Sequence, residues 1–217
     1  MDNQQLMTRT PVAVLGTLTE FHHEPLPYNL KTLVELATTL RPDLLCLDIT
    51  PDQWQRRDFA DLPPEYRAAL LPLAYQTDMV VVPIGEVRPL EEPQASGWRE
   101  RASALLRKGL ILLQRTSPDP AAINQGWRHH VANELYDTIA RLAGQGARHA
   151  WHAHTAYLTQ RVLETARRDP GCRILVVVNV RYCHHLRPAL RQSPEIEVVP
   201  YSTFEHPLVA ESLRQNR

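Results

Sequence analysis

The sequence lacks a charge excess, long apolar runs and paired cysteines, and each absence excludes a class of protein. Its 217 residues include 24 basic and 24 acidic side chains, so we do not expect it to hold nucleic acid by bulk charge. No apolar run approaches the roughly 20 residues of a membrane-spanning helix, and the polar residues 1–5 do not resemble a secretory signal. The cysteines are scattered and odd in number, which indicates reduced thiols (Cys46, Cys172 and Cys183). These features predict a cytoplasmic protein with no membrane segment.

Glycine is scarce as well, and the signatures of several common enzyme families are missing. Only 8 glycines stand against 18 prolines, and the first apolar run ends in the single Gly16, not in a dinucleotide-binding G-x-G-x-x-G. The sequence contains no P-loop, G-x-S-x-G, H-E-x-x-H or C-x-x-C pattern. A standard nucleotide-binding loop, hydrolase elbow or structural zinc site is therefore not expected.

Five short apolar runs, separated by helical stretches, predict the fold class. Four of them are nearly continuous aliphatic runs, which is typical of strands buried on both faces of a parallel sheet. The fifth alternates more and ends at Pro200, which places it near an edge. The runs cover residues 11–16, 43–49, 78–85, 173–180 and 196–201. We predict a single α/β domain over residues 1–217, with a mainly parallel sheet of about five strands flanked by helices.

The intervening stretches have helical periodicity, and most of them fall between the third and fourth strands. Residues 95–147 are predicted to form a helical insertion there. The first helix of that insertion is apolar nearly all round, so it is either part of the core or an oligomer interface. The predicted helices cover residues 28–40, a segment opened by Pro63 and Pro64, and residues 97–115, 126–143 and 148–168.

Polar side chains follow four of the predicted strands, at the edge where parallel sheets bind ligands. They are His22, His23, Asp48, Glu86, Arg181, Tyr182, His184 and His185. Each has a simpler explanation: Asp48 or Thr50 could cap a turn at Pro51, Glu86 could pair with Arg88, and the late histidines could line the start of a helix. Their coincidence at one edge nevertheless predicts a functional site.

The remaining histidines are assigned from helical periodicity. In the helix predicted over residues 148–168, His152 lies at the edge of the apolar face, and we expect it to point into the fold. His154 and His149 are expected in solvent. His129 and His130 are also expected on the surface, opposite the apolar side of the preceding helix.

Both ends of the chain resemble one family. The segment Val14–Thr17, the histidines after it and residues 40–54 are similar to the opening of the TraB/PrgY–GumN–TIKI superfamily, which includes ChaN-like and erythromycin-esterase-like proteins. Residues 173–186 and 196–201 are similar to the family's late strand, its histidine-bearing turn and its final strand. The resemblance implies an α/β fold, a site at the strand ends, and proteolysis, ester hydrolysis or haem binding as the activity.

The chain departs from the family pattern at three places. Thr19 stands where the family has a histidine two residues after Gly-Thr, and Asp48 replaces the usual glutamate of the second strand. Asn179 and Arg181 stand where a glycine usually precedes the late histidine. The chain is therefore interpreted as a divergent member, whose resemblance predicts the site's location more firmly than its reaction.

The leading hypothesis is a hydrolase, of peptidase or esterase type, acting on a small-molecule or peptide substrate. His23, Asp48, Glu86 and His185 are the predicted ligands of a divalent metal (Zn, Mn, Fe or Co), with His22 and His184 as alternatives to their neighbours. Arg181 and Tyr182 are expected to stabilise an oxyanion. A metal-free version uses one histidine as the general base, oriented by Asp48 or Glu86.

The alternative is a module without catalytic activity. A degenerate site could bind haem, a small ligand or a partner protein, and the late histidines, Tyr182 and Cys183 would suit haem ligation. The apolar helix of the insertion also leaves a homo-oligomer or a protein partner open.

Overall fold

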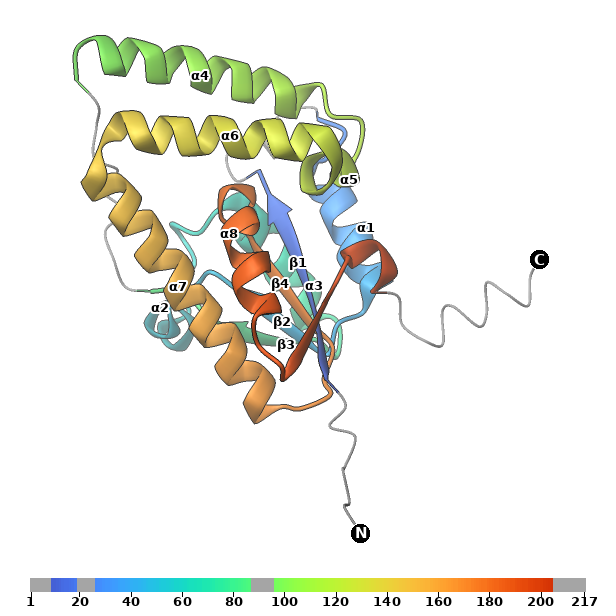
Figure 1. Ribbon diagram of the computed structural model, residues 1–217. Coiled ribbons are helices and arrows are strands. Elements are labelled where there is room, and N and C mark those ends of the chain that lie inside the picture. Colours follow the sequence, from blue (N-terminus) through green and yellow to red (C-terminus); the bar gives the residue numbers. More distant parts are fainter. Residues whose placement is uncertain (1–8, 19–25, 87–95, 205–217) are drawn as a thin grey trace.

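A computed structural model describes residues 9–18, 26–86 and 96–204, which form a five-stranded parallel sheet flanked by helices (Figure 1). The strand order is β3-β2-β4-β1-β5, and neighbouring strands in this sheet are parallel. The predicted α/β class and the five predicted strands are confirmed. The strands are β1 (Thr10–Thr17), β2 (Leu44–Leu47), β3 (Val80–Pro83), β4 (Ile174–Asn179) and β5 (Ile196–Val199).

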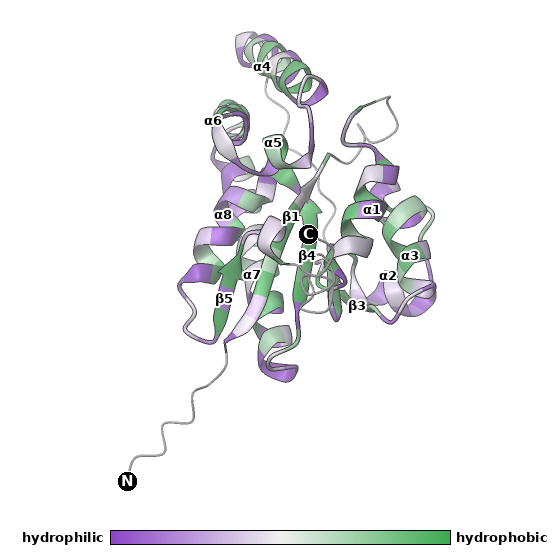
Figure 2. Ribbon diagram, turned by 90° about the vertical axis from the view of Figure 1, so that its right-hand side faces the viewer, coloured by the Kyte–Doolittle hydropathy of each residue, from purple (hydrophilic) through white to green (hydrophobic). Residues whose placement is uncertain are grey.

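The sheet is buried on both faces, which explains why its strands read as continuous apolar runs. Along β1, Ala13 and Leu15 face one apolar cluster, whereas Val12 and Val14 face the other. The first cluster lies under α1 (Leu30–Leu40), the π-helical segment η2 (Glu65–Leu70) and α3 (Leu71–Tyr75). The second lies under α7 (Gln145–Arg168) and α8 (Val180–Arg191), on the other side of the sheet in Figure 2.

Side-chain caps begin the helices on the first face. The Asn29 side chain accepts a hydrogen bond from the Thr32 amide at the start of α1. Thr50 and Gln53 form a reciprocal capping box at the start of α2 (Pro51–Arg56). Because Thr50 makes this cap, Asp48 is left to form other contacts.

The chain between β3 and β4 is helical, as predicted, but its first helix is not part of the core. This stretch contains α4 (Trp98–Arg115), α5 (Pro120–Asn124) and α6 (Gly126–Ala143), followed by α7. α4 packs against α6 and lies at the outer edge of the structure (Figure 2). Leu110 is buried, but Leu105 and Leu112 are 70% and 64% exposed, so the core expectation is wrong for these two residues. The oligomer interface stays a prediction.

None of the helices in the described part of the chain combines the length and the apolar character needed to cross a bilayer.

The chain connections reverse at the carboxyl ends of β1 and β4. These strands are neighbours, yet the chain leaves β1 for α1 on one face and leaves β4 for α8 on the other. Such a reversal is a topological switch point, where open α/β sheets bind ligands. Gly16 permits the close approach, because a Cβ there would lie 2.8 Å from the Cα of Val180, the first residue of α8.

The outer edge of β1 is only partly covered by β5, whose pairing ends at Ala13. The remaining backbone groups are satisfied by side chains. The Asn124 side chain accepts a hydrogen bond from the Gly16 amide (2.6 Å) and donates one to the Gly16 carbonyl (3.1 Å). It therefore makes the hydrogen bonds that a neighbouring strand would otherwise make. Arg187 donates to the Val14 carbonyl (2.9 Å) and to the Asn124 side chain (3.0 Å). These bonds attach both α5 and α8 to the central sheet.

Gly16→Ala is expected to lower the free energy of unfolding by about 1–3 kcal/mol, because the new methyl group overlaps the backbone of Val180. Gly109→Ala is the control: its Cβ meets nothing within 4 Å inside α4, so it should stabilise by up to about 1 kcal/mol. Urea denaturation of the two variants and the parent measures both effects. Equal midpoints for the two variants would contradict the close β1–α8 approach.

Candidate functional site

A buried aspartate–histidine pair lies at the carboxyl end of the sheet. Asp48 directly follows β2, and its Oδ2 atom lies 2.9 Å from Nε2 of His154 on α7. The two side chains are 19% and 7% exposed, respectively. Because a carboxylate only accepts hydrogen bonds, Nε2 of His154 carries the proton.

The prediction that His154 lies in solvent, and His152 inside, is wrong. His154 is buried and His152 is exposed. At 100° per residue, both lie about 80° from the centre of the apolar face of α7, on opposite sides, so periodicity does not distinguish them. The pairing with Asp48 accounts for the burial of His154, because a buried polar group needs a partner.

Aromatic and basic side chains adjoin this pair. The ring of Tyr182 on α8 lies 4.9 Å from that of His154, between centroids. Arg181 donates from Nη2 to the Tyr182 hydroxyl (2.7 Å). Gly85, after β3, lets its backbone approach Asp48, because a Cβ there would lie 2.8 Å from Asp48 Oδ1. Glu86 follows and is half-buried.

The neighbouring switch point contains a carboxylate that the sequence patterns missed. Glu65 of η2 is 1% exposed and accepts a hydrogen bond from the Thr17 hydroxyl (2.8 Å). Burial and the charges of Asp48 and Glu65 raise the pKa of Tyr66 well above its usual value, so the phenol stays protonated and donates to the Val177 carbonyl (2.9 Å). The only sequence signal was that Glu65 directly precedes Tyr66, a residue of the predicted apolar face. We call Thr17, Asp48, Glu65, His154 and Tyr182 the strand-end cluster.

His184 and His185 belong to a different cluster. α8 begins at Val180, so the two histidines do not open the helix but lie one turn inside it. Their Nε2 atoms lie 3.2 Å and 3.5 Å from Oδ1 of Asp137 on α6. Burial and the adjacent His185 lower the pKa of His184, against the opposing effect of Asp137, so the neutral imidazole is favoured.

Among the described residues, the structure does not bring the predicted metal ligands Asp48, Glu86 and His185 together. In the described part of the chain, the group whose donor atoms all lie within 4.8 Å of one another is Asp137, His184 and His185. Asp48 and Glu86 do not join His185 in such a group, because Asp48 faces His154. His23 and its neighbour His22 lie outside the described residues.

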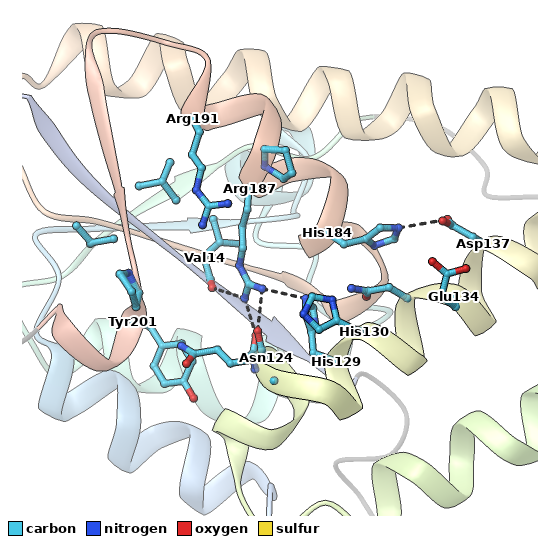
Figure 3. A pocket seen from close by; sticks show the side chains of 17 residues that line it. Val14, Asn124, His129, His130, Glu134, Asp137, His184, Arg187, Arg191 and Tyr201 are labelled. Atoms are coloured by element: carbon cyan, nitrogen blue, oxygen red, sulfur yellow. Dashed lines mark hydrogen bonds and ion pairs between the residues drawn. The ribbon is translucent and has the colours of Figure 1, made fainter.

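A cavity of about 490 Å³ lies between α6, α8 and the end of β5 (Figure 3). His130, Asp137, His184 and Arg191 line it, together with the Arg187–Asn124 pair that closes the edge of β1. A second cavity of about 120 Å³ lies on the other side of Asp137 and is lined by His152 and His185. Asp137 therefore contributes to both cavities.

His129, expected on the surface, is 6% exposed and forms part of the wall of the larger cavity. Its Nδ1 donates to the Ile123 carbonyl (2.9 Å), and its Nε2 accepts from Arg187 (3.2 Å). Burial and the Arg187 charge lower the pKa of His129 to about 4. The helical wheel missed this because α5 and α8 cover that side of α6.

Cys183 is fully buried in the core, and burial raises its pKa. A buried protonated thiol is a poor haem ligand, so this residue does not favour the haem alternative.

No protein-family model, curated protein or solved structure matches this chain. The fold class therefore rests on the structure itself, and the superfamily stays a prediction.

The buried His129 should make stability depend on pH. The unfolded chain takes up a proton near pH 6.5, whereas the folded protein does so only near pH 4, so stability is complete above pH 6.5 and is lost as the pH falls toward 4. The shift corresponds to a loss of about 3 kcal/mol. His129→Gln should remove most of this loss in denaturant titrations at pH 7, 5.5 and 4, although it lowers stability at pH 7.

His149→Gln is the control, because His149 is exposed and is not among the groups that shift the pKa of His129. This variant should keep the parent's pH dependence. If His129→Gln kept it as well, the buried neutral state of His129 would be contradicted.

Proposed function

We propose that the protein is a hydrolase in which His154 acts as the general base and Asp48 orients it. The observation that carries the proposal is the 2.9 Å contact between Asp48 and His154 at the carboxyl end of the sheet. Two chain segments 106 residues apart form this contact, next to the switch point where sheets of this type bind ligands.

The orientation of His154 suits the removal of a proton from water. Nε2–H donates to Asp48, which leaves Nδ1 as the basic nitrogen of the ring. The carboxylate holds the tautomer and stabilises the imidazolium that forms when Nδ1 takes the proton. The nearly buried environment strengthens this interaction, because water competes little with it.

Arg181 and Tyr182 are the proposed stabilisers of the charge that develops on the substrate oxygen. The Arg181 guanidinium donates to the Tyr182 hydroxyl oxygen, which makes the phenolic proton a better donor. Tyr182 adjoins His154, so the base and the donor can act on one bound group. The proposed substrate is a small ester or amide, or a peptide, whose carbonyl is attacked by water.

This proposal replaces the metal-dependent version. Asp48 was a predicted ligand together with His23, Glu86 and His185, but its carboxylate faces His154. The resemblance of residues 14–17 and 173–186 to the TraB superfamily favours the same reaction class, and we propose the chain as a divergent member.

Purified protein should hydrolyse at least one substrate in a panel of nitrophenyl esters and chromogenic peptides. His154→Ala and Asp48→Asn should each lower kcat/KM by about 10²–10⁴-fold, the usual contribution of a positioned base. Circular dichroism melting shows whether each variant is folded.

His152→Ala is the matched control on the same helix, because His152 is exposed and takes no part in the strand-end cluster. It should keep the parent's activity. Undiminished turnover in folded His154→Ala would refute the proposed base. A parent protein with no turnover on any substrate would favour the alternative of a non-catalytic ligand-binding module.

A further inference from the structure

The two histidines of α8 and the aspartate of α6 form a compact set of metal-type donors. Both imidazole Nε2 atoms approach the same oxygen of Asp137, at 3.2 Å for His184 and 3.5 Å for His185. All three donor atoms lie within 4.8 Å of one another (Figure 3 shows His184 and Asp137). The set is half-buried, and its members come from two helices that pack together.

Hydrogen bonding does not satisfy all three donors. His184 takes the hydrogen bond to Asp137, whereas Nε2 of His185 is shielded from solvent and has no hydrogen-bond partner among the described residues. The two imidazole rings lie side by side, 3.9 Å apart between centroids. A cation bound by all three atoms would provide a partner for each of them.

The donor separations match those of a small tetrahedral site. Metal–ligand bonds of about 2.0–2.1 Å at tetrahedral angles place ligand atoms about 3.3–3.4 Å apart. The two distances to Asp137 lie on either side of this value. Two imidazoles and one carboxylate suit zinc and similar transition metals, whereas calcium and magnesium prefer oxygen ligands.

We propose that Asp137, His184 and His185 bind one divalent transition-metal ion of the zinc type, with water or a small anion in the fourth position. Asp137 and His184 line the 490 Å³ cavity, which gives such a ligand a route to the ion. Arg187 and Arg191 line the same cavity, together with the carboxylate of Glu134. This site does not depend on the proposed hydrolase, since it shares no residue with the Asp48–His154 pair.

Metal titration of tag-free protein, stripped with a chelator, tests the site directly. Calorimetry with Zn²⁺ should give one equivalent of binding, and Co²⁺ should produce the strong visible absorption of a four-coordinate ion. Asp137→Asn and His185→Asn, which preserve side-chain size, should each weaken Zn²⁺ binding by more than about 100-fold, since even outer residues of metal sites contribute 10–100-fold. Mg²⁺ should not compete at equal concentration.

His149→Asn is the control, because this residue is exposed and lines neither of the two cavities beside the set. It should bind Zn²⁺ like the parent. No stoichiometric binding, or binding that Asp137→Asn and His185→Asn retain, would overturn the proposal. If a variant fails to fold, the Co²⁺ spectrum of the parent tests the proposed site instead. Weak absorption bands, typical of six-coordinate Co²⁺, would contradict the proposal. These measurements do not involve turnover, so they are independent of the hydrolase proposal.

Discussion

The incomplete cover on the edge of β1 is the constraint on which much of this structure depends. β5 pairs with β1 only as far as Ala13, so the backbone groups of Val14 and Gly16 need other partners in a buried environment. Asn124 and Arg187 supply them. The same bonds tie the helical insertion and α8 to the sheet. Arg187 also contacts His129, and burial together with the Arg187 charge lowers the pKa of that histidine.

Two polar clusters meet where α7 and α8 pack together: His154 and Tyr182 belong to the first, and His184 and His185 to the second. The strand-end cluster lies at the carboxyl ends of the strands, whereas the Asp137 group lies toward α6. Trp151 of α7 has ring contacts with Tyr182 of the first cluster and with His184 and His185 of the second. Because the large Trp151 ring lies between the two clusters, they form two separate sites and not one large site. Tyr182 and His184 of α8 thus belong to different clusters, because residues two positions apart along a helix point about 200° apart.

The fold was largely predictable, and the site only in part. Continuous aliphatic runs predict buried parallel strands, and all five runs are strands because each is covered on both faces or lies at an edge. Asp48 was also identifiable, because a carboxylate in an apolar run needs a partner. Its partner was not, since His152 and His154 fit the apolar face of α7 equally well. Glu65 and Asp137 were missed, because nothing in their local pattern reveals which residues lie opposite them.

By itself, the sequence determined the layers of this protein: where strands and helices form, and that polar side chains gather at one edge of the sheet. Those features depend on local periodicity and on residues close in the chain. Only the tertiary structure decided which side chains meet. The pairing of Asp48 with His154 and of Asp137 with His184 joins positions 106 and 47 residues apart. The packing of α6, α7 and α8 brings these side chains together. A hydrophobic pattern indicates that one face of a helix is buried, but it does not indicate which polar side chain lies opposite that face.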